Sequence, residues 1–94
     1  MFASMRRYRL QPEMQGEFMR RVDESFADQI AAQPGFVSYE LIRPDDKDDA
    51  VASISVFDSR AHAEASHKVA EEWVHQNLPS MPKPSKVGGE LVTH

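Results

Sequence analysis

Apolar and polar residues follow two different periods along this chain, and the changes of period divide it into predicted strands and helices. Residues 2–10 alternate with a period of two and present no purely polar face, which predicts a strand. The next segment predicts a long amphipathic helix that begins near Pro12 and ends at Pro34 and Gly35. Its apolar residues recur at every fourth position, at Met14, Phe18, Val22, Phe26 and Ile30.

The remaining segments predict two more strands, a second helix and a final strand. Segments 36–43 and 50–57 alternate again, and the charged segment 44–49 between them predicts a hairpin turn. This acidic turn lacks the central glycine and terminal glutamate of a calcium loop, so a solvated turn is expected. A helix is predicted from a cap at Asp58 or Ser59 to about Leu78, followed by a strand over 87–94. The expected inward positions of this helix are Ala63, Ser66 or His67, Ala70, Trp73 or Val74, and Asn77 or Leu78.

The order strand, helix, strand, strand, helix, strand predicts an α+β fold of the ferredoxin-like βαββαβ type, formed by a single domain over residues 1–94. In that fold a four-stranded antiparallel sheet carries two helices on one face. The other face keeps apolar positions that need a cover, and a chain this short has little core of its own. A homodimer joined through the sheet faces is therefore expected.

Composition restricts the partners and the chemistry. The chain has 11 Lys and Arg against 15 Asp and Glu, a net charge of −4, which argues against nucleic acid or an anionic membrane as partner. The absence of cysteine excludes disulfides, thiolate catalysis and iron–sulfur ligation. No apolar run has the length of a membrane span or a signal peptide, so a cytoplasmic location is expected. Histidine spacing does not fit a metal site, and no phosphate-binding or dinucleotide-binding motif occurs.

Segments 6–12 (RRYRLQP), 33–39 (QPGFVSY) and 55–65 (SVFDSRAHAEA) resemble the antibiotic biosynthesis monooxygenase (ABM) superfamily of dimeric α/β barrels. The resemblance implies a cofactor-independent monooxygenase that oxidises an aromatic or quinol-type small molecule in a cavity between sheet and helices. No cofactor and no metal are expected. The alternative function is a non-catalytic homodimer of the same fold that binds a small ligand or is purely structural.

The chain also departs from the pattern of that family. Many members carry tryptophan where Phe57 stands and a helix histidine at the position of Ser66, whereas here the histidine is His67. Haem-degrading relatives combine a first-strand asparagine with a helix tryptophan and histidine. Because the first strand here has no asparagine, haem degradation is not expected.

Two residues are predicted to be catalytic. His67 is a candidate general acid or base, since imidazole titrates near neutrality and can relay a proton of a hydroxyaromatic substrate. The alternative role for His67 is that of a structural histidine held by a buried hydrogen bond. Tyr39 offers a phenolic donor to a quinol oxygen, or else serves ordinary sheet packing.

Four residues are predicted to bind the ligand: Arg7, Ser66, Trp73 and Asn77. Trp73 can stack on a planar ligand or belong to the core, and Asn77 can orient a carbonyl or cap its helix. Arg6 and Arg7 point to opposite faces of the first strand, so one of them approaches an interior or an interface. That arginine either binds an anionic ligand oxygen or pairs with Glu40 or Glu90 on a neighbouring strand.

Overall fold

The strands and helices of the structure follow the order predicted from the sequence. The structure, a computed structural model, describes residues 1–43, 45 and 49–94. The elements are β1 (Phe2–Arg9), α1 (Pro12–Arg21), the π-helical segment η1 (Val22–Phe26), α2 (Ala27–Ala31), β2 (Phe36–Ile42), β3 (Ala50–Phe57), α3 (Arg60–Asn77) and β4 (Ser85–Glu90). The acidic turn predicted over 44–49 lies largely outside the described residues, but the antiparallel pairing of β2 with β3 agrees with a hairpin.

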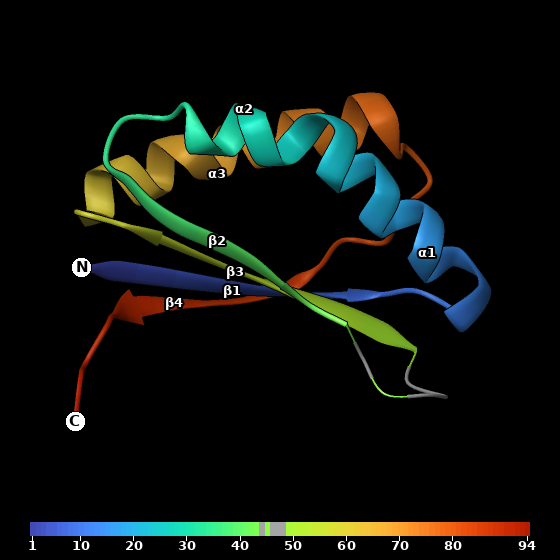
Figure 1. Ribbon diagram of the computed structural model, residues 1–94, viewed down its shortest axis with the longest axis horizontal. Coiled ribbons are helices and arrows are strands. Elements are labelled where there is room, and N and C mark those ends of the chain that lie inside the picture. Colours follow the sequence, from blue (N-terminus) through green and yellow to red (C-terminus); the bar gives the residue numbers. More distant parts are fainter. Residues whose placement is uncertain (44, 46–48) are drawn as a thin grey trace.

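The sheet has the strand order β2-β3-β1-β4, and every neighbouring pair is antiparallel. Both helical segments lie on the same face of this sheet (Figure 1). The predicted α+β ferredoxin-like βαββαβ fold is therefore confirmed. None of the helices within the described ranges has the length and hydropathy needed to span a membrane.

The first helix differs from the prediction because it contains the π-helical segment η1. Phe18, Val22, Phe26 and Ile30 are all buried, while Met14 at the start is 54% exposed. In a regular α-helix, positions four apart rotate by about 40° per step, so Ile30 would lie about 120° from Phe18. The wider turn of a π-helix offsets this rotation and keeps the apolar residues on one face.

A sharp turn between α2 and β2 fixes the path of the chain into the sheet. Gly35 adopts φ 77°, and its carbonyl oxygen accepts a hydrogen bond from the Asp58 backbone N–H at 2.8 Å. A Cβ at this position would lie 2.3 Å from Asp58 Oδ1. Only glycine fits both the left-handed backbone and the close approach of the segment that starts α3.

The last strand is Ser85–Glu90, so the predicted range 87–94 was displaced toward the C-terminus. β4 pairs only with β1, from Ser85 opposite Arg7 to Glu90 opposite Phe2. β1 begins at Phe2, so the residues after Glu90 have no partner strand beyond a single hydrogen bond from Leu91 N–H to the Met1 carbonyl oxygen, at 2.9 Å. The strand ends where its neighbour ends.

The sheet face opposite the helices keeps apolar side chains in contact with solvent. Met5 on β1 lies between Ile54 on β3 and Val87 on β4 in the strand register. Met5 is 43% exposed, Val87 69% and Ile42 on β2 45%. This face has the apolar character that the sequence predicted for an uncovered surface.

Candidate functional site

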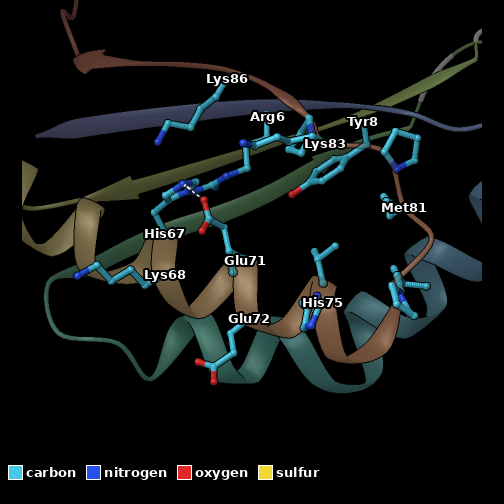
Figure 2. Close-up of a pocket in the computed structure, with 16 residues that line it drawn as sticks. Arg6, Tyr8, His67, Lys68, Glu71, Glu72, His75, Met81, Lys83 and Lys86 are labelled. Carbon is cyan, nitrogen blue, oxygen red and sulfur yellow. Dashed lines mark hydrogen bonds and ion pairs between the residues drawn. The ribbon is translucent and has the colours of Figure 1, made fainter.

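A cavity of about 680 Å³ opens between β1, α3 and the proline-rich segment that leads into β4. Figure 2 shows side chains from these elements converging on it from opposite sides. One wall is polar and carries Arg6, Tyr8, His67, Glu71 and Lys86. The apolar part of the lining consists of Ala70, Val74, Leu78, Pro79, Met81, Pro82 and Pro84.

Strand alternation and helix periodicity bring the polar residues together. Arg6 and Tyr8 lie two positions apart on β1 and point to the helix side of the sheet, where both are buried. His67 and Glu71 are four residues apart on α3, so they lie on neighbouring turns of one helix face. Lys86 stands directly opposite Arg6 in the register of β4 with β1.

Arg6, His67 and Glu71 form a hydrogen-bonded chain across the cavity wall. Nη2 of Arg6 donates to Nδ1 of His67, and Nε2 of His67 lies 2.5 Å from Oε1 of Glu71 (Figure 2). A guanidinium has no acceptor, so Nδ1 must carry the lone pair and Nε2 the proton. The contacts therefore fix one neutral tautomer of the imidazole, with its basic nitrogen on the side of Arg6.

The surroundings hold the pKa of His67 below its ordinary value of 6.5. Burial is the main cause, and the positive charges of Arg6 and Lys86 add to it, whereas Glu71 acts in the opposite direction. His67 is consequently neutral at pH 7 and able to accept a proton. Glu71 would stabilise the imidazolium formed by such a transfer, as carboxylates do for catalytic histidines.

Tyr8 adds a protonated hydroxyl to the same wall. Burial raises the pKa of Tyr8, and the Arg6 charge only partly opposes this, so the phenol stays a hydrogen-bond donor at neutral pH. Its ring packs against Phe18 with a centroid distance of 5.4 Å. Figure 2 shows its oxygen directed into the cavity, toward Arg6 and Glu71.

The structure places Arg6, rather than Arg7, at the cavity. Arg6 is 6% exposed, whereas Arg7 is exposed on the opposite face of the sheet and does not line the cavity. The sequence analysis left open which of the two arginines faces inward, but it included Arg7 among the predicted ligand-binding residues. The structure corrects that choice to Arg6. Within the described residues Arg6 forms no ion pair with Glu40 or Glu90, and its hydrogen-bond partner is His67.

Three other predicted ligand-binding residues lie elsewhere. The Ser66 hydroxyl is buried and donates to the Ala63 carbonyl oxygen at 2.7 Å. Trp73 Nε1 donates to Ser25 Oγ at 2.6 Å, and Asn77 Nδ2 donates to the Trp73 carbonyl oxygen at 2.9 Å. Trp73 and Asn77 border a smaller hollow of about 300 Å³, which is lined by residues of α1, η1 and α3. This hollow is separate from the cavity that His67 lines.

Tyr39 also stays outside the lining of the main cavity. Its ring packs edge-on against Phe26 at a centroid distance of 5.4 Å, and burial raises the pKa of its phenol. Of the two predicted catalytic residues, the structure therefore brings His67 to the cavity, and the phenol that lines this cavity is that of Tyr8.

The other histidines of α3 have different surroundings. His62 Nδ1 lies 2.6 Å from Asp58 Oδ1, away from the cavity. His75 is exposed and, like His67, belongs to the lining of the cavity. No group of three metal-ligating side chains occurs among the residues that the structure describes.

Sequence reasoning missed Glu71, Tyr8 and Lys86 as residues of this site. Glu71 had a usable signal, because a carboxylate four residues after a histidine shares its helix face. Tyr8 had another, since it lies on the same strand face as Arg6. Lys86 gave none, because the register of β4 with β1 depends on long-range pairing.

Comparison with known proteins identifies a matching family and several solved structures of similar fold. A family model described as antibiotic biosynthesis monooxygenase matches residues 1–73. The cofactor-independent oxygenase SnoaB of Streptomyces nogalater, in a mutant form, is 21% identical with a TM-score of 0.71, and the match covers 99% of this chain and 94% of that one. The haem degrader MhuD of Mycobacterium tuberculosis, with haem bound, is 17% identical with a TM-score of 0.75, covering 100% and 98%.

A monooxygenase of Streptomyces coelicolor in complex with nanaomycin D is 16% identical with a TM-score of 0.74, covering 99% of this chain and 92% of that one. At these identities the three structures support the fold and do not assign a substrate. No curated protein matches the chain.

Proposed function

The chain belongs to the antibiotic biosynthesis monooxygenase family, and from this premise we propose that it is a cofactor-independent monooxygenase of an aromatic or quinol-type small molecule. One observation carries the proposal: a neutral histidine, oriented by a carboxylate and touching a guanidinium, faces a cavity of ligand size. The fold relative SnoaB is a cofactor-independent oxygenase, which agrees with this chemistry.

The chemistry starts with removal of a hydroxyl proton from the substrate. The substrate hydroxyl oxygen accepts hydrogen bonds from the N–H groups of Arg6. Arg6 then no longer donates to Nδ1 of His67, and this nitrogen is free to accept the hydroxyl proton. Arg6 favours the ionised oxygen because an adjacent positive charge lowers the pKa of a phenol. Glu71 holds the imidazolium through Nε2–H, and Tyr8 supplies a further donor at the same wall.

The remaining steps need no electrons from outside the substrate. The electron-rich ring carbon of the phenolate reduces O₂ and forms a C–O bond with it. The resulting peroxide takes the proton back from the His67 imidazolium and becomes a hydroperoxide. Loss of water then breaks the O–O bond and the C–H bond of that carbon, which leaves a carbonyl. One oxygen atom enters the product and the other leaves as water. The apolar residues of the lining contact the ring and reduce its exposure to bulk water.

Oxygen uptake tests this proposal. The purified protein, treated with a chelator and given no flavin or nicotinamide, is expected to consume O₂ with hydroquinones, naphthohydroquinones or anthrones above their autoxidation rate. With ¹⁸O₂, mass spectrometry should find a single labelled oxygen in the quinone product. Turnover abolished by the chelator and restored by a metal ion contradicts the cofactor-free mechanism, and unlabelled product contradicts monooxygenation.

We also propose that two copies associate through the sheet faces that carry Met5, Ile54 and Val87. A face this apolar on a 94-residue chain is stabilised by burial against an identical face. Light scattering at micromolar concentration should give about twice the chain mass of 10.7 kDa. Val87→Asp should shift the mass toward one chain, because it buries a charge in the interface.

Met14→Asp is the matched control for this variant. Met14 is 54% exposed on α1, on the helix side of the sheet, so the same kind of change should leave the dimer intact. A monomeric wild-type protein, or equal dissociation by both substitutions, contradicts association through the sheet faces.

A further inference from the structure

Arg6 is a buried guanidinium that lacks the partner such a group normally has. It is 6% exposed, and no carboxylate of the described residues lies within 4.0 Å of its nitrogen atoms. Across residues 1–43, 45 and 49–94, its hydrogen-bonding partner is the neutral ring of His67. None of the described side-chain nitrogen atoms is both fully buried and without a hydrogen-bond partner. The other N–H groups of Arg6 are therefore accessible, and the space they border is the cavity. A buried arginine is normally paired with an anion, and this one leaves that position open to a ligand.

A second cation stands beside Arg6 on the same face of the sheet. Lys86 on β4 is directly opposite Arg6 on β1, and Figure 2 shows its side chain reaching from β4 toward His67. Directly opposed residues of an antiparallel pair have Cβ atoms about 5 Å apart, and like charges at that distance destabilise the sheet. An anion between the two side chains removes this repulsion.

The side chains that line the cavity carry a net positive charge, although the net charge of the chain is negative. Its lining contains the cations Arg6, Lys68, Lys83 and Lys86, four in all, against the two carboxylates Glu71 and Glu72, and Glu71 is already held by His67. The whole chain carries a net charge of −4. The concentration of positive charge at this one cavity draws in an anionic ligand over long range.

We propose that the ligand of this cavity is a hydroxyaromatic acid, whose ring hydroxyl binds Arg6 and His67 and whose carboxylate binds Lys86. This inference rests on the proposed function and names the class of its substrate. The apolar lining accommodates the aromatic ring, and the cavity volume of about 680 Å³ fits a molecule of one to three rings. Arg6 with Lys86 provides one cation for each of the two oxygen groups.

Binding without turnover tests this inference. Under anaerobic conditions, calorimetry compares two matched pairs that differ only by a carboxylate: 2,5-dihydroxybenzoate with hydroquinone, and 1,4-dihydroxy-2-naphthoate with 1,4-dihydroxynaphthalene. The wild-type protein is expected to bind the acid of at least one pair about tenfold or more tightly, since a charge-assisted hydrogen bond has this magnitude. The preference should weaken at high salt because Lys86 is exposed.

Lys86→Gln and Arg60→Gln each remove one positive charge and form the matched comparison. Arg60 is exposed, pairs with Glu64 at 3.0 Å and does not line the cavity. We expect Lys86→Gln to reduce the preference to about threefold or less while Arg60→Gln keeps it, as the loss of one specific ionic contact predicts. Lys86→Gln should still bind the neutral rings as the wild type does.

Three outcomes overturn the inference: equal affinity for acid and neutral ring, failure of both acids to bind, or an unchanged preference in Lys86→Gln. The proposed monooxygenase activity is judged separately, by oxygen uptake with neutral quinols. Failure of the carboxylate preference therefore leaves the proposed function standing. Absence of oxygen uptake with selective acid binding leaves a binding protein for hydroxyaromatic acids.

Discussion

Replacing His67 by alanine is expected to lower kcat/KM for a hydroxyaromatic substrate by about 100-fold or more, the usual contribution of a positioned general base. His67 is the neutral imidazole of the cavity lining whose Nδ1 accepts from Arg6 and whose Nε2–H is held by Glu71. Without it, the imidazole that accepts the hydroxyl proton in the proposed mechanism is lost. Oxygen uptake at saturating O₂, corrected for autoxidation of the same substrate, measures the effect.

The pH profile distinguishes a base from a merely structural histidine. In the proposed mechanism only neutral His67 accepts the substrate proton, so kcat/KM should fall as the pH drops through the pKa of His67. Burial and the charges of Arg6 on β1 and Lys86 on β4 hold that pKa below 6.5, whereas Glu71 on α3 raises it. The acid limb should therefore lie below pH 6.5, and Glu71→Gln should move it lower still.

His62→Ala is the control for this substitution. His62 lies on the same helix, pairs with Asp58 and does not line the cavity, so its loss should leave kcat/KM within about twofold. Equal oxygen uptake by the wild type and His67→Ala contradicts the role of His67. So does an acid limb that persists unchanged in His67→Ala.

Arg6→Gln should lower kcat/KM by about 100- to 1,000-fold, the range found when a preorganised donor to a developing oxyanion is removed. Arg6 is a buried cation of the cavity lining, and in the proposed mechanism it binds the ionised substrate oxygen. Its removal also frees His67 from a positive charge that lowers the pKa of the imidazole, so the acid limb should move to higher pH. A lower rate together with that shift identifies an electrostatic role.

Arg6→Lys separates charge from geometry. Lysine keeps the positive charge but not the planar set of donors, so it should recover part of the rate lost in Arg6→Gln. Circular dichroism and the thermal transition should confirm that both variants are folded. Folded Arg6→Gln protein with unchanged kcat/KM contradicts the assignment of Arg6 as the group that binds the ionised oxygen.

Most of the fold could be predicted because its signals are local. Strand alternation placed β3 at its observed bounds, and Ser59, one of two predicted caps, does accept a hydrogen bond from the His62 N–H at 3.2 Å. The π-helical segment was missed because helix prediction assumes a regular α-helical turn. The apolar residues from Phe18 to Ile30 recur at every fourth position, whereas the apolar face of an α-helix alternates steps of three and four, and this difference already indicated a wider turn. β4 was misplaced because its bounds follow those of β1.

The site was predicted less completely because it depends on contacts between distant segments. Helix periodicity left Ser66 and His67 as alternative inward positions, and in the structure His67 lines the cavity. The Ser66 hydroxyl instead donates to its own helix, and Trp73 donates to Ser25 of η1. The choice between Arg6 and Arg7 depends on which sheet face the helices cover, and strand alternation alone leaves that open. Lys86 joins Arg6 only through the pairing of β1 with β4.

The ionisation state of a bound hydroxyaromatic tests the central claim most directly, because it reports what Arg6 and His67 do to the substrate before oxygen reacts. A naphthol bound anaerobically at pH 7, more than two units below its pKa in water, should show the absorption band of the naphtholate in the wild-type protein. The band should be absent in Arg6→Gln and reduced in His67→Ala. A bound ligand that keeps the spectrum of the neutral naphthol in the wild-type protein contradicts the account.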